Sequence, residues 1–418
     1  MSRLWIAVPL VYLIAAAGFG LYMRIYALYP MPSVNYVHVL HAHSHLAMLG
    51  WGYVALTLLL THEFWGEEAV RGRSFRIQFG VTQAVVVPMT AAFLMQGYAA
   101  WSIAFSSIHI ILNYVYMAWF RLQSRRAVNG RALGSSAADR KPASLRYAQG
   151  ALLCLLLSSF GPWTLAVLGA TGRSDTIYFN DAVYAYLHVQ YNGWFLLGLA
   201  ALLLARLDKL GTPAPYSQLT AIRLYRLFMA TLLPSILLSF TADLNTAGKM
   251  VALLAGLLQL VFVCGFLLLF VKAWLDLRRA RSFSWSERLG ALALFCLLLK
   301  AALDPLPALP GLAPLVAGTR SLVIAYLHLA LLGFISLLLL ALFGQRGWIP
   351  ARSRFAAWGA GLIAAGFLAN ESVLALQSVQ QWRLAPIAGG DWLLAAAAAV
   401  MLMGAILLLA GAWRTAAD

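Results

Sequence analysis

The stretch AHSHLAMLGW at residues 42–51 has two counterparts in the chain, AYLHVQYNGW at 185–194 and AYLHLALLGF at 325–334. All three fit one frame, Ala-[Tyr/His]-x-His-x4-Gly-[Trp/Phe], and each lies in a long apolar run. The frame histidines are His45, His188 and His328, separated by 188 − 45 = 143 and 328 − 188 = 140 residues. This spacing predicts three diverged copies of one unit of roughly 140 residues.

The composition of the chain is typical of a polytopic membrane protein. Apolar residues make up 62% of the 418 residues and charged residues only 11%, with a mean hydropathy of +0.80. A soluble domain with this composition would have to expose most of its apolar side chains to water. We therefore expect an all-α integral membrane protein in contact with lipid.

Twelve apolar runs are long enough to cross a hydrocarbon core of about 30 Å. The first is expected to be a retained span rather than a removed signal peptide. We expect a single membrane domain over 1–418, made of three four-helix units at about 1–122, 147–274 and 286–413. The expected spans are 4–28, 37–61, 77–98, 101–121, 147–170, 180–205, 218–241, 250–274, 286–303, 320–343, 354–371 and 391–413.

The formal charge of +16 indicates orientation rather than a nucleic-acid partner. Of the 30 Lys and Arg residues, 24 lie in the two termini and in the loops after even-numbered spans, and six lie on the opposite side. Cytoplasmic loops carry the excess of Lys and Arg. This distribution predicts that both termini are cytoplasmic and that the protein resides in a bacterial inner membrane.

Four spans carry a histidine at one expected depth. His45, His109, His188 and His328 each lie about eight residues into an even-numbered span, or roughly 12 Å below the outer interface at 1.5 Å per residue. A histidine inside the bilayer is costly, and neutral imidazole is a common ligand of iron, copper and zinc. The layer therefore predicts metal or haem ligation. For His109 taken singly, a hydrogen bond between helices explains the residue equally well.

The span at 37–61 is the densest candidate site. A helix that advances 100° per residue aligns His41 and His45 on one face, whereas His43 points about 160° away from both. One helix is therefore expected to present histidines to two different neighbouring helices.

Other residues of the frames allow two explanations each. Gly followed by Trp or Phe is expected either to allow close helix packing or to make room for a macrocycle. Tyr186, Tyr191, Asn192 and Asn113 are candidates for orienting ligand rings or for hydrogen bonding between helices. No acidic residue is expected in the middle of a span, which argues against a proton relay of carboxylates.

The expected topology and histidine placement together resemble the catalytic subunit of the haem-copper oxidase superfamily, above all its nitric oxide reductase branch. In topology the resemblance covers essentially the whole chain. It implies that a low-spin haem, expected to be b-type, is bound by His328 with His45, His41 or His43. It further implies that His188 binds copper.

The chain departs from that family at several ligand positions. The span at 218–241 has no histidine where the family has an adjacent pair, and the tenth span has one histidine instead of His-x-His. What remains is a bis-histidine haem between the second and tenth spans, with a second metal at His188 and His109, or a non-haem centre of several histidines binding copper or iron. The candidate metal ligands are then His41, His45, His109, His188 and His328.

A second resemblance is to NnrS-type haem- and copper-containing membrane proteins. Their second span also opens with a His-Ala-His run, here His41-Ala42-His43, although Ser44 stands where that family has Glu. Both resemblances imply a haem- or metal-binding membrane oxidoreductase with oxygen or nitric oxide chemistry near the outer face. Its electrons would come from a quinol or a periplasmic donor. The alternative is a non-enzymatic protein that handles copper or haem or responds to nitric oxide.

Overall fold

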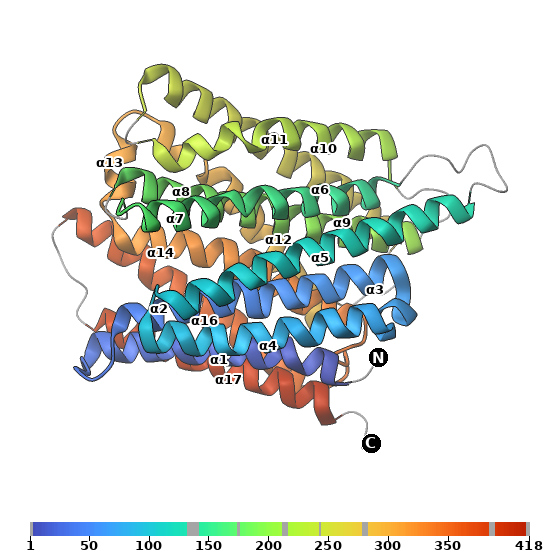
Figure 1. The fold of residues 1–418 in the computed structure, drawn as a ribbon, viewed down its shortest axis with the longest axis horizontal. Coiled ribbons are helices and arrows are strands. Elements are labelled where there is room, and N and C mark those ends of the chain that lie inside the picture. Colours follow the sequence, from blue (N-terminus) through green and yellow to red (C-terminus); the bar gives the residue numbers. More distant parts are fainter. Residues whose placement is uncertain are drawn as a thin grey trace.

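A computed structural model describes residues 3–131, 142–173, 176–210, 216–241, 244–277, 283–383 and 389–414 (Figure 1). Within these ranges the regular secondary structure is helical and no strand occurs. The expected all-α class is therefore confirmed.

The described ranges contain eleven helices that are long and apolar enough to cross a membrane. A further pair, α10 (Gln218–Leu232) and η3 (Pro234–Phe240), meets the same criteria together but bends by 46°. Proline lacks an amide hydrogen and disfavours helix before it, so Pro234 accounts for this bend. If the pair counts as one span, the total is the expected twelve. The chain is a multi-pass membrane protein.

Three spans change from α-helix to π-helix directly after the frame histidine. A π-helical turn contains an extra residue and occurs frequently at functional sites. The sequence pattern did not predict these segments. The three spans are α2 (Tyr36–His45), η1 (Leu46–Gly52) and α3 (Tyr53–Arg71); α8 (Ile177–His188), η2 (Val189–Phe195) and α9 (Leu196–Leu210); and α14 (Arg320–His328), η5 (Leu329–Ser336) and α15 (Leu337–Gln345).

The frame-bearing spans meet in the interior along their π-helical segments. The Trp51 indole of η1 donates a hydrogen bond of 2.9 Å to the Ser336 hydroxyl of η5. A Cβ added at Gly52 of η1 would lie 2.9 Å from the Phe195 ring of η2. These contacts join the segment after His45 to the corresponding segments after the other two frame histidines.

The other helices lie around these spans, and each π-helical segment packs on at least one of them. Helix α1 contacts η1, α6 contacts η2 and α12 contacts η5. The surrounding helices are α1 (Arg3–Leu28), α4 (Arg73–Gln96), α5 (Ala100–Arg131), α6 (Ala143–Ser158), α7 (Phe160–Ala170), α11 (Thr246–Leu277), α12 (Trp285–Leu303), α16 (Arg354–Arg383) and α17 (Gly390–Arg414), with η4 (Leu306–Ala308) and α13 (Leu312–Ala317) after α12.

The frame glycines allow these outer helices to approach closely. A Cβ added at Gly193 or Gly333 would come within 2.5 Å of an outer-helix atom, closer than real Cβ contacts, and one added at Gly50 would lie 3.3 Å from Tyr12. The outer-helix residues in contact are Tyr12 for Gly50, Cys154 for Gly193, and Cys296 and Phe367 for Gly333. Close packing, one of the two explanations offered for the Gly-aromatic pair, is therefore what these glycines provide.

The two chain ends lie at the same end of the bundle (Figure 1). There the Arg3 guanidinium donates a hydrogen bond of 2.9 Å to the Trp413 carbonyl, which joins α1 to α17. In the interior of this end, Glu63 of α3 accepts hydrogen bonds from Arg346 and pairs with Lys209 of α9 at 2.9 Å. Buried charges in a membrane protein are tolerated when they are paired in this way.

Candidate functional site

The histidine layer lies at the opposite end of the spans. His45, His188 and His328 are the last α-helical residues before their π-helical segments, between eight and eleven residues from the start of their helices. His109 lies nine residues after the start of α5. The similar offsets agree with the expected layer, but the structure distributes the histidines among different neighbours.

The histidines of α2 face two sides, as the helical periodicity predicts. The Nδ1 atom of His43 lies 2.8 Å from the Ala16 carbonyl of α1. His45 stacks on the Phe93 ring of α4, with 4.0 Å between centroids, and His41 packs edge-on against Tyr98 at 4.4 Å. The prediction that His43 points away from His41 and His45 is confirmed.

On the first side, His43 of α2 contacts helix α1, and Arg24 of α1 donates to the Asn370 amide that contacts His328. Because a carbonyl only accepts, the contact with Ala16 places the His43 proton on Nδ1. The Nε2 atom of neutral His43 then carries a lone pair that is free for a ligand. His43 lies on the second span and His328 on the tenth, the two spans that the bis-histidine prediction names.

The ring of His328 rests against two consecutive residues of α16. The Asn370 Nδ2 atom lies 3.2 Å from His328 Nδ1, and the Glu371 Oε1 atom lies 3.7 Å from the same nitrogen. Arg24 donates a hydrogen bond of 3.4 Å to the Asn370 Oδ1 atom. The sequence analysis missed all three of these polar neighbours.

Glu371 corrects the expectation that no carboxylate lies within a span. The predicted span ended at residue 371, whereas α16 continues to Arg383 and passes the membrane criteria from Arg354 to Trp382. The prediction was wrong because the helix extends through a more polar stretch than the apolar run. Glu371 therefore lies inside a candidate span and beside a candidate ligand.

On the second side of α2, His45 has one ring nitrogen committed to the backbone. Its Nδ1 atom donates to the His41 carbonyl at 2.9 Å, so its Nε2 atom carries the lone pair. The Tyr98 hydroxyl, in the turn after α4, lies 3.3 Å from that Nε2 atom. The residue is thus oriented in a tautomer that can accept a bond through Nε2.

His109 lies on this second side, next to His45. It is fully buried, packs edge-on against Tyr53 at 4.8 Å and is an electrostatic neighbour of His45. Neither of its ring nitrogens makes a hydrogen bond of normal geometry, and the Oδ1 atom of Asn113, one turn later, is also unpartnered. The expected second pair of His188 and His109 stays a prediction.

His188 lies in a third environment, where both ring nitrogens have partners. Its Nε2 atom is 2.8 Å from the Ser235 hydroxyl of η3, and its Nδ1 atom is 3.3 Å from the Asn192 amide nitrogen. The Ser235 hydroxyl itself donates to the Leu232 carbonyl, so Nε2 of His188 is the donor in the first bond. Asn192 thus orients the His188 ring, one of the two roles expected for it.

A buried ion pair continues from Asn192. The Lys300 ammonium of α12 donates to Asn192 Oδ1 and to Asp304 Oδ2, each at 2.6 Å. The Tyr326 hydroxyl of α14 donates to the other oxygen of Asp304 at 2.6 Å. His188, Lys300 and Asp304 are only 4%, 3% and 8% exposed, so their charges and hydrogen bonds are satisfied inside the protein. We call this set, from Ser235 to Tyr326, the Lys300 network.

The candidate ligands do not form one metal-binding cluster. Within the described ranges, no three His, Cys, Asp or Glu side chains converge into a group that could hold a metal ion. The five expected ligands thus occupy separate places instead of one multi-histidine centre. A haem iron needs only axial protein ligands, and the pair of His43 and His328 offers two imidazoles from two spans. The chemistry of these two side chains suits axial ligands of a haem iron.

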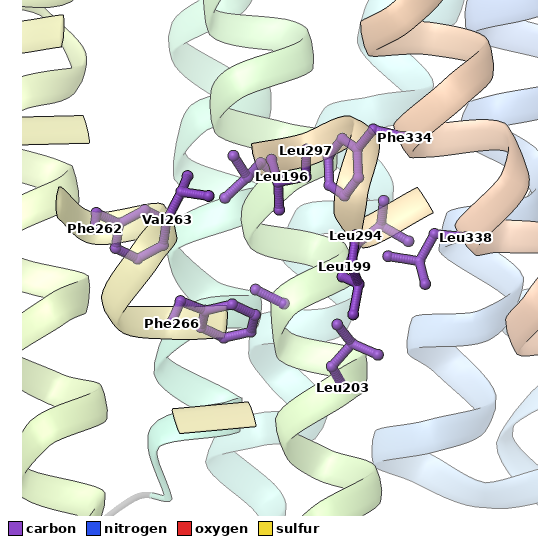
Figure 2. A pocket seen from close by; sticks show the side chains of 11 residues that line it. Leu196, Leu199, Leu203, Phe262, Val263, Phe266, Leu294, Leu297, Phe334 and Leu338 are labelled. Atoms are coloured by element: carbon purple, nitrogen blue, oxygen red, sulfur yellow. The ribbon is translucent and has the colours of Figure 1, made fainter. Parts of the chain in front are cut away.

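An apolar cavity lies deeper in the bundle (Figure 2). Phe262 and Phe266 of α11 lie on one side of it, and Phe334 of η5 lies on the other. Its lining contains no histidine and no charged residue, so it offers space for apolar molecules and no ligand for a metal.

Comparison with models of known protein families gives no match, and a search of curated proteins gives none. The resemblance to haem-copper oxidases and to NnrS-type proteins stays a prediction.

Proposed function

We propose that this protein is a membrane oxidoreductase whose redox group, a haem or a copper ion, is bound by imidazoles between α2 and α14. The observation that carries the proposal is the orientation of the His43 ring in α2, with His328 of α14 as the second imidazole. The two residues come from different spans, and His43 has its Nδ1 proton fixed on a backbone carbonyl. Such a contact orients a histidine ring and fixes which nitrogen is free to bind a metal.

The roles of the protein groups follow from these contacts. His43 and His328 would each bind the group through Nε2, and Arg24 would offset negative charge beside it. When bound, a haem or copper ion supplies one-electron transfer. Small uncharged molecules such as oxygen or nitric oxide are the proposed substrates.

The proposed arrangement in the membrane has three equivalent four-helix units, with both termini cytoplasmic in a bacterial inner membrane. Two features beyond the frame support the repeat. A π-helical segment follows each frame histidine. The charged residues Glu63, Arg206 and Arg346 each lie 18 residues after their frame histidine, since 63 − 45, 206 − 188 and 346 − 328 are equal. In this orientation the redox group lies near the outer face, accessible to a quinol or a periplasmic donor.

The test is an optical spectrum of the detergent-purified protein, oxidised and dithionite-reduced, with elemental analysis of the same sample. We expect sharp reduced bands and about one iron per chain, as for a bis-histidine haem. Both signals should be lost in His43→Gln and His328→Gln. The matched control is His62→Gln, a histidine of α3 that packs on Trp348 and lies away from the layer.

Two outcomes would contradict parts of the proposal. A colourless protein that contains copper would discard the haem and keep the redox centre, whereas a protein with neither iron nor copper would overturn the proposal. Steady consumption of oxygen or nitric oxide with a reduced quinol analogue would support an enzyme. Bound metal without turnover would favour the non-enzymatic alternative.

A further inference from the structure

One nitrogen of His328 faces two partners of opposite hydrogen-bonding character. Asn370 Nδ2, an amide donor, lies 3.2 Å from His328 Nδ1, and Glu371 Oε1, a carboxylate acceptor, lies 3.7 Å from it. An imidazole nitrogen with a lone pair accepts from the amide, whereas one that carries a proton donates to the carboxylate. The two neighbours therefore favour different tautomers of the same ring.

In the structure the amide is the closer partner and is held in place from both ends. Arg24 donates to Asn370 Oδ1 at 3.4 Å, which fixes the orientation of the amide. Asn370 Nδ2 also donates to Glu371 Oε1 at 2.9 Å. With the amide donating to Nδ1, neutral His328 must carry its proton on Nε2. In that tautomer Nε2 has no lone pair with which to bind a metal.

We propose that Asn370 and Glu371 are positioning residues that exchange their hydrogen bonds to His328 when it binds the redox group. This inference rests on the proposed function. On binding, the Nε2 proton leaves to solvent and Nδ1 takes up one proton from solvent, so the imidazole stays neutral and no net proton is gained or lost. The Asn370 amide turns away from Nδ1, and the Nδ1–H group then donates a hydrogen bond to the Glu371 carboxylate.

His43 provides an internal contrast because its Nδ1 partner is a backbone carbonyl. The Ala16 carbonyl lies 2.8 Å from His43 Nδ1 and accepts only, so His43 is in the ligand tautomer before anything binds. The two proposed ligands thus differ in kind: His43 is preset, and His328 becomes a ligand only after the hydrogen-bond exchange.

The first test needs no cofactor and uses ¹⁵N-histidine nuclear magnetic resonance on the metal-free full-length protein at pH 8. The His328 signals are identified by their loss in His328→Gln. We expect the proton of His328 on Nε2 and that of His43 on Nδ1. A His328 proton on Nδ1 in the metal-free protein would overturn the inference and leave the proposed function untouched.

The second test loads the wild type, Glu371→Gln and Asp391→Asn with haemin and measures haem content and reduction potential. Asp391 is the matched control, because it also acts on Arg24 but is no partner of His328. A carboxylate that accepts from the ligand ring makes the ring a stronger donor, which favours the oxidised metal. We therefore expect full haem content in all three proteins and a higher potential in Glu371→Gln than in Asp391→Asn.

The outcomes distinguish a failure of the hydrogen-bond exchange from a failure of the proposed function. Equal potentials in Glu371→Gln and Asp391→Asn would overturn the hydrogen-bond exchange while the haem site stands. A wild type that binds neither haemin nor copper would overturn the proposed function, and the inference with it. Restoration of the wild-type potential by Glu371→Asp would further support the role of the carboxylate.

Discussion

Helix α14 has two polar faces, and they differ in how many of their polar groups have hydrogen-bond partners inside the protein. Tyr326 and His328 are two residues apart, which places them about 200° apart around the helix. Tyr326 faces the Lys300 network, where the ion pair and the histidine have their partners inside the protein. His328 faces Asn370 and Glu371, which both approach its Nδ1 atom, while its Nε2 atom makes no hydrogen bond to the part of the chain that the structure describes.

This difference indicates which buried histidines hold the fold together and which are available for a ligand. A buried polar group with all its partners stabilises one arrangement of the helices, whereas a buried donor or acceptor without one is costly unless something binds it. The Lys300 network is then structural, and the proposed function assigns the ligand role to His43 and His328. The predictions below test that division, from the largest expected effect to the smallest.

The largest effect is expected from Lys300→Met. The change leaves Asp304 buried without its cation, and breaking a buried pair costs about 3–5 kcal/mol. Equilibrium unfolding in mixed detergent micelles measures the loss. The double variant Lys300→Met with Asp304→Leu removes both charges and should recover most of the stability. A single variant as stable as the wild type would show that the network is not structural.

Ser235→Ala is expected to cost about 2 kcal/mol, because it leaves two buried donors without an acceptor. These donors are His188 Nε2 at 2.8 Å and Gln259 Nε2 at 2.7 Å. The same unfolding assay measures the change, and Ser217→Ala, an exposed helix cap, serves as a control of smaller effect. The optical spectrum should not change. A loss of the optical bands would indicate that the redox group is bound near His188.

Ser336→Ala is expected to cost about 1 kcal/mol by removing the acceptor of the Trp51 indole. The contact joins two π-helical segments, so its loss tests how tightly the frame-bearing spans are held together. Tryptophan fluorescence during unfolding follows the effect, and Ser336→Thr, which keeps the hydroxyl, should behave like the wild type. No change in Ser336→Ala would show that the hydrogen bond contributes little to the packing of these spans.

The smallest effect is expected at Tyr216, which lies beside Asp208 at the end of the bundle that holds the termini. Burial and the neighbouring Asp208 carboxylate raise the pKa of Tyr216 above its usual value of about 10. Above pH 10 the Tyr216 hydroxyl therefore loses its proton in the unfolded chain at a lower pH than in the folded protein. The free energy of unfolding then falls as pH rises. Tyr216→Phe should reduce that alkaline loss in unfolding curves between pH 9 and 11. An unchanged slope would contradict this assignment.

The sequence predicted the parts of this architecture that depend on helical periodicity. The apolar runs predicted the spans, and the angle of 100° per residue correctly separated His43 from His41 and His45. The π-helical segments were not predicted, because one extra residue in a turn leaves no signature in composition.

The partners of the histidines were the part that the sequence could not predict. Lys300 and Asp304 stood at the end of an apolar run and resembled an ordinary helix end, although α14 and η2 cover them. Glu371 stood at the expected end of its span, although α16 continues for three more turns. Both errors arise because a polar residue next to an apolar run looks exposed until the neighbouring helices are known.

The most direct measurement is a side-by-side comparison of His328→Gln and His188→Gln, with the reduced optical spectrum and the metal content determined on the same samples. The account predicts that His328→Gln loses the redox group and remains folded. His188→Gln should retain the group and unfold more easily than the wild type. The reverse result, with the group lost from His188→Gln and retained in His328→Gln, would contradict the division between the two faces of α14.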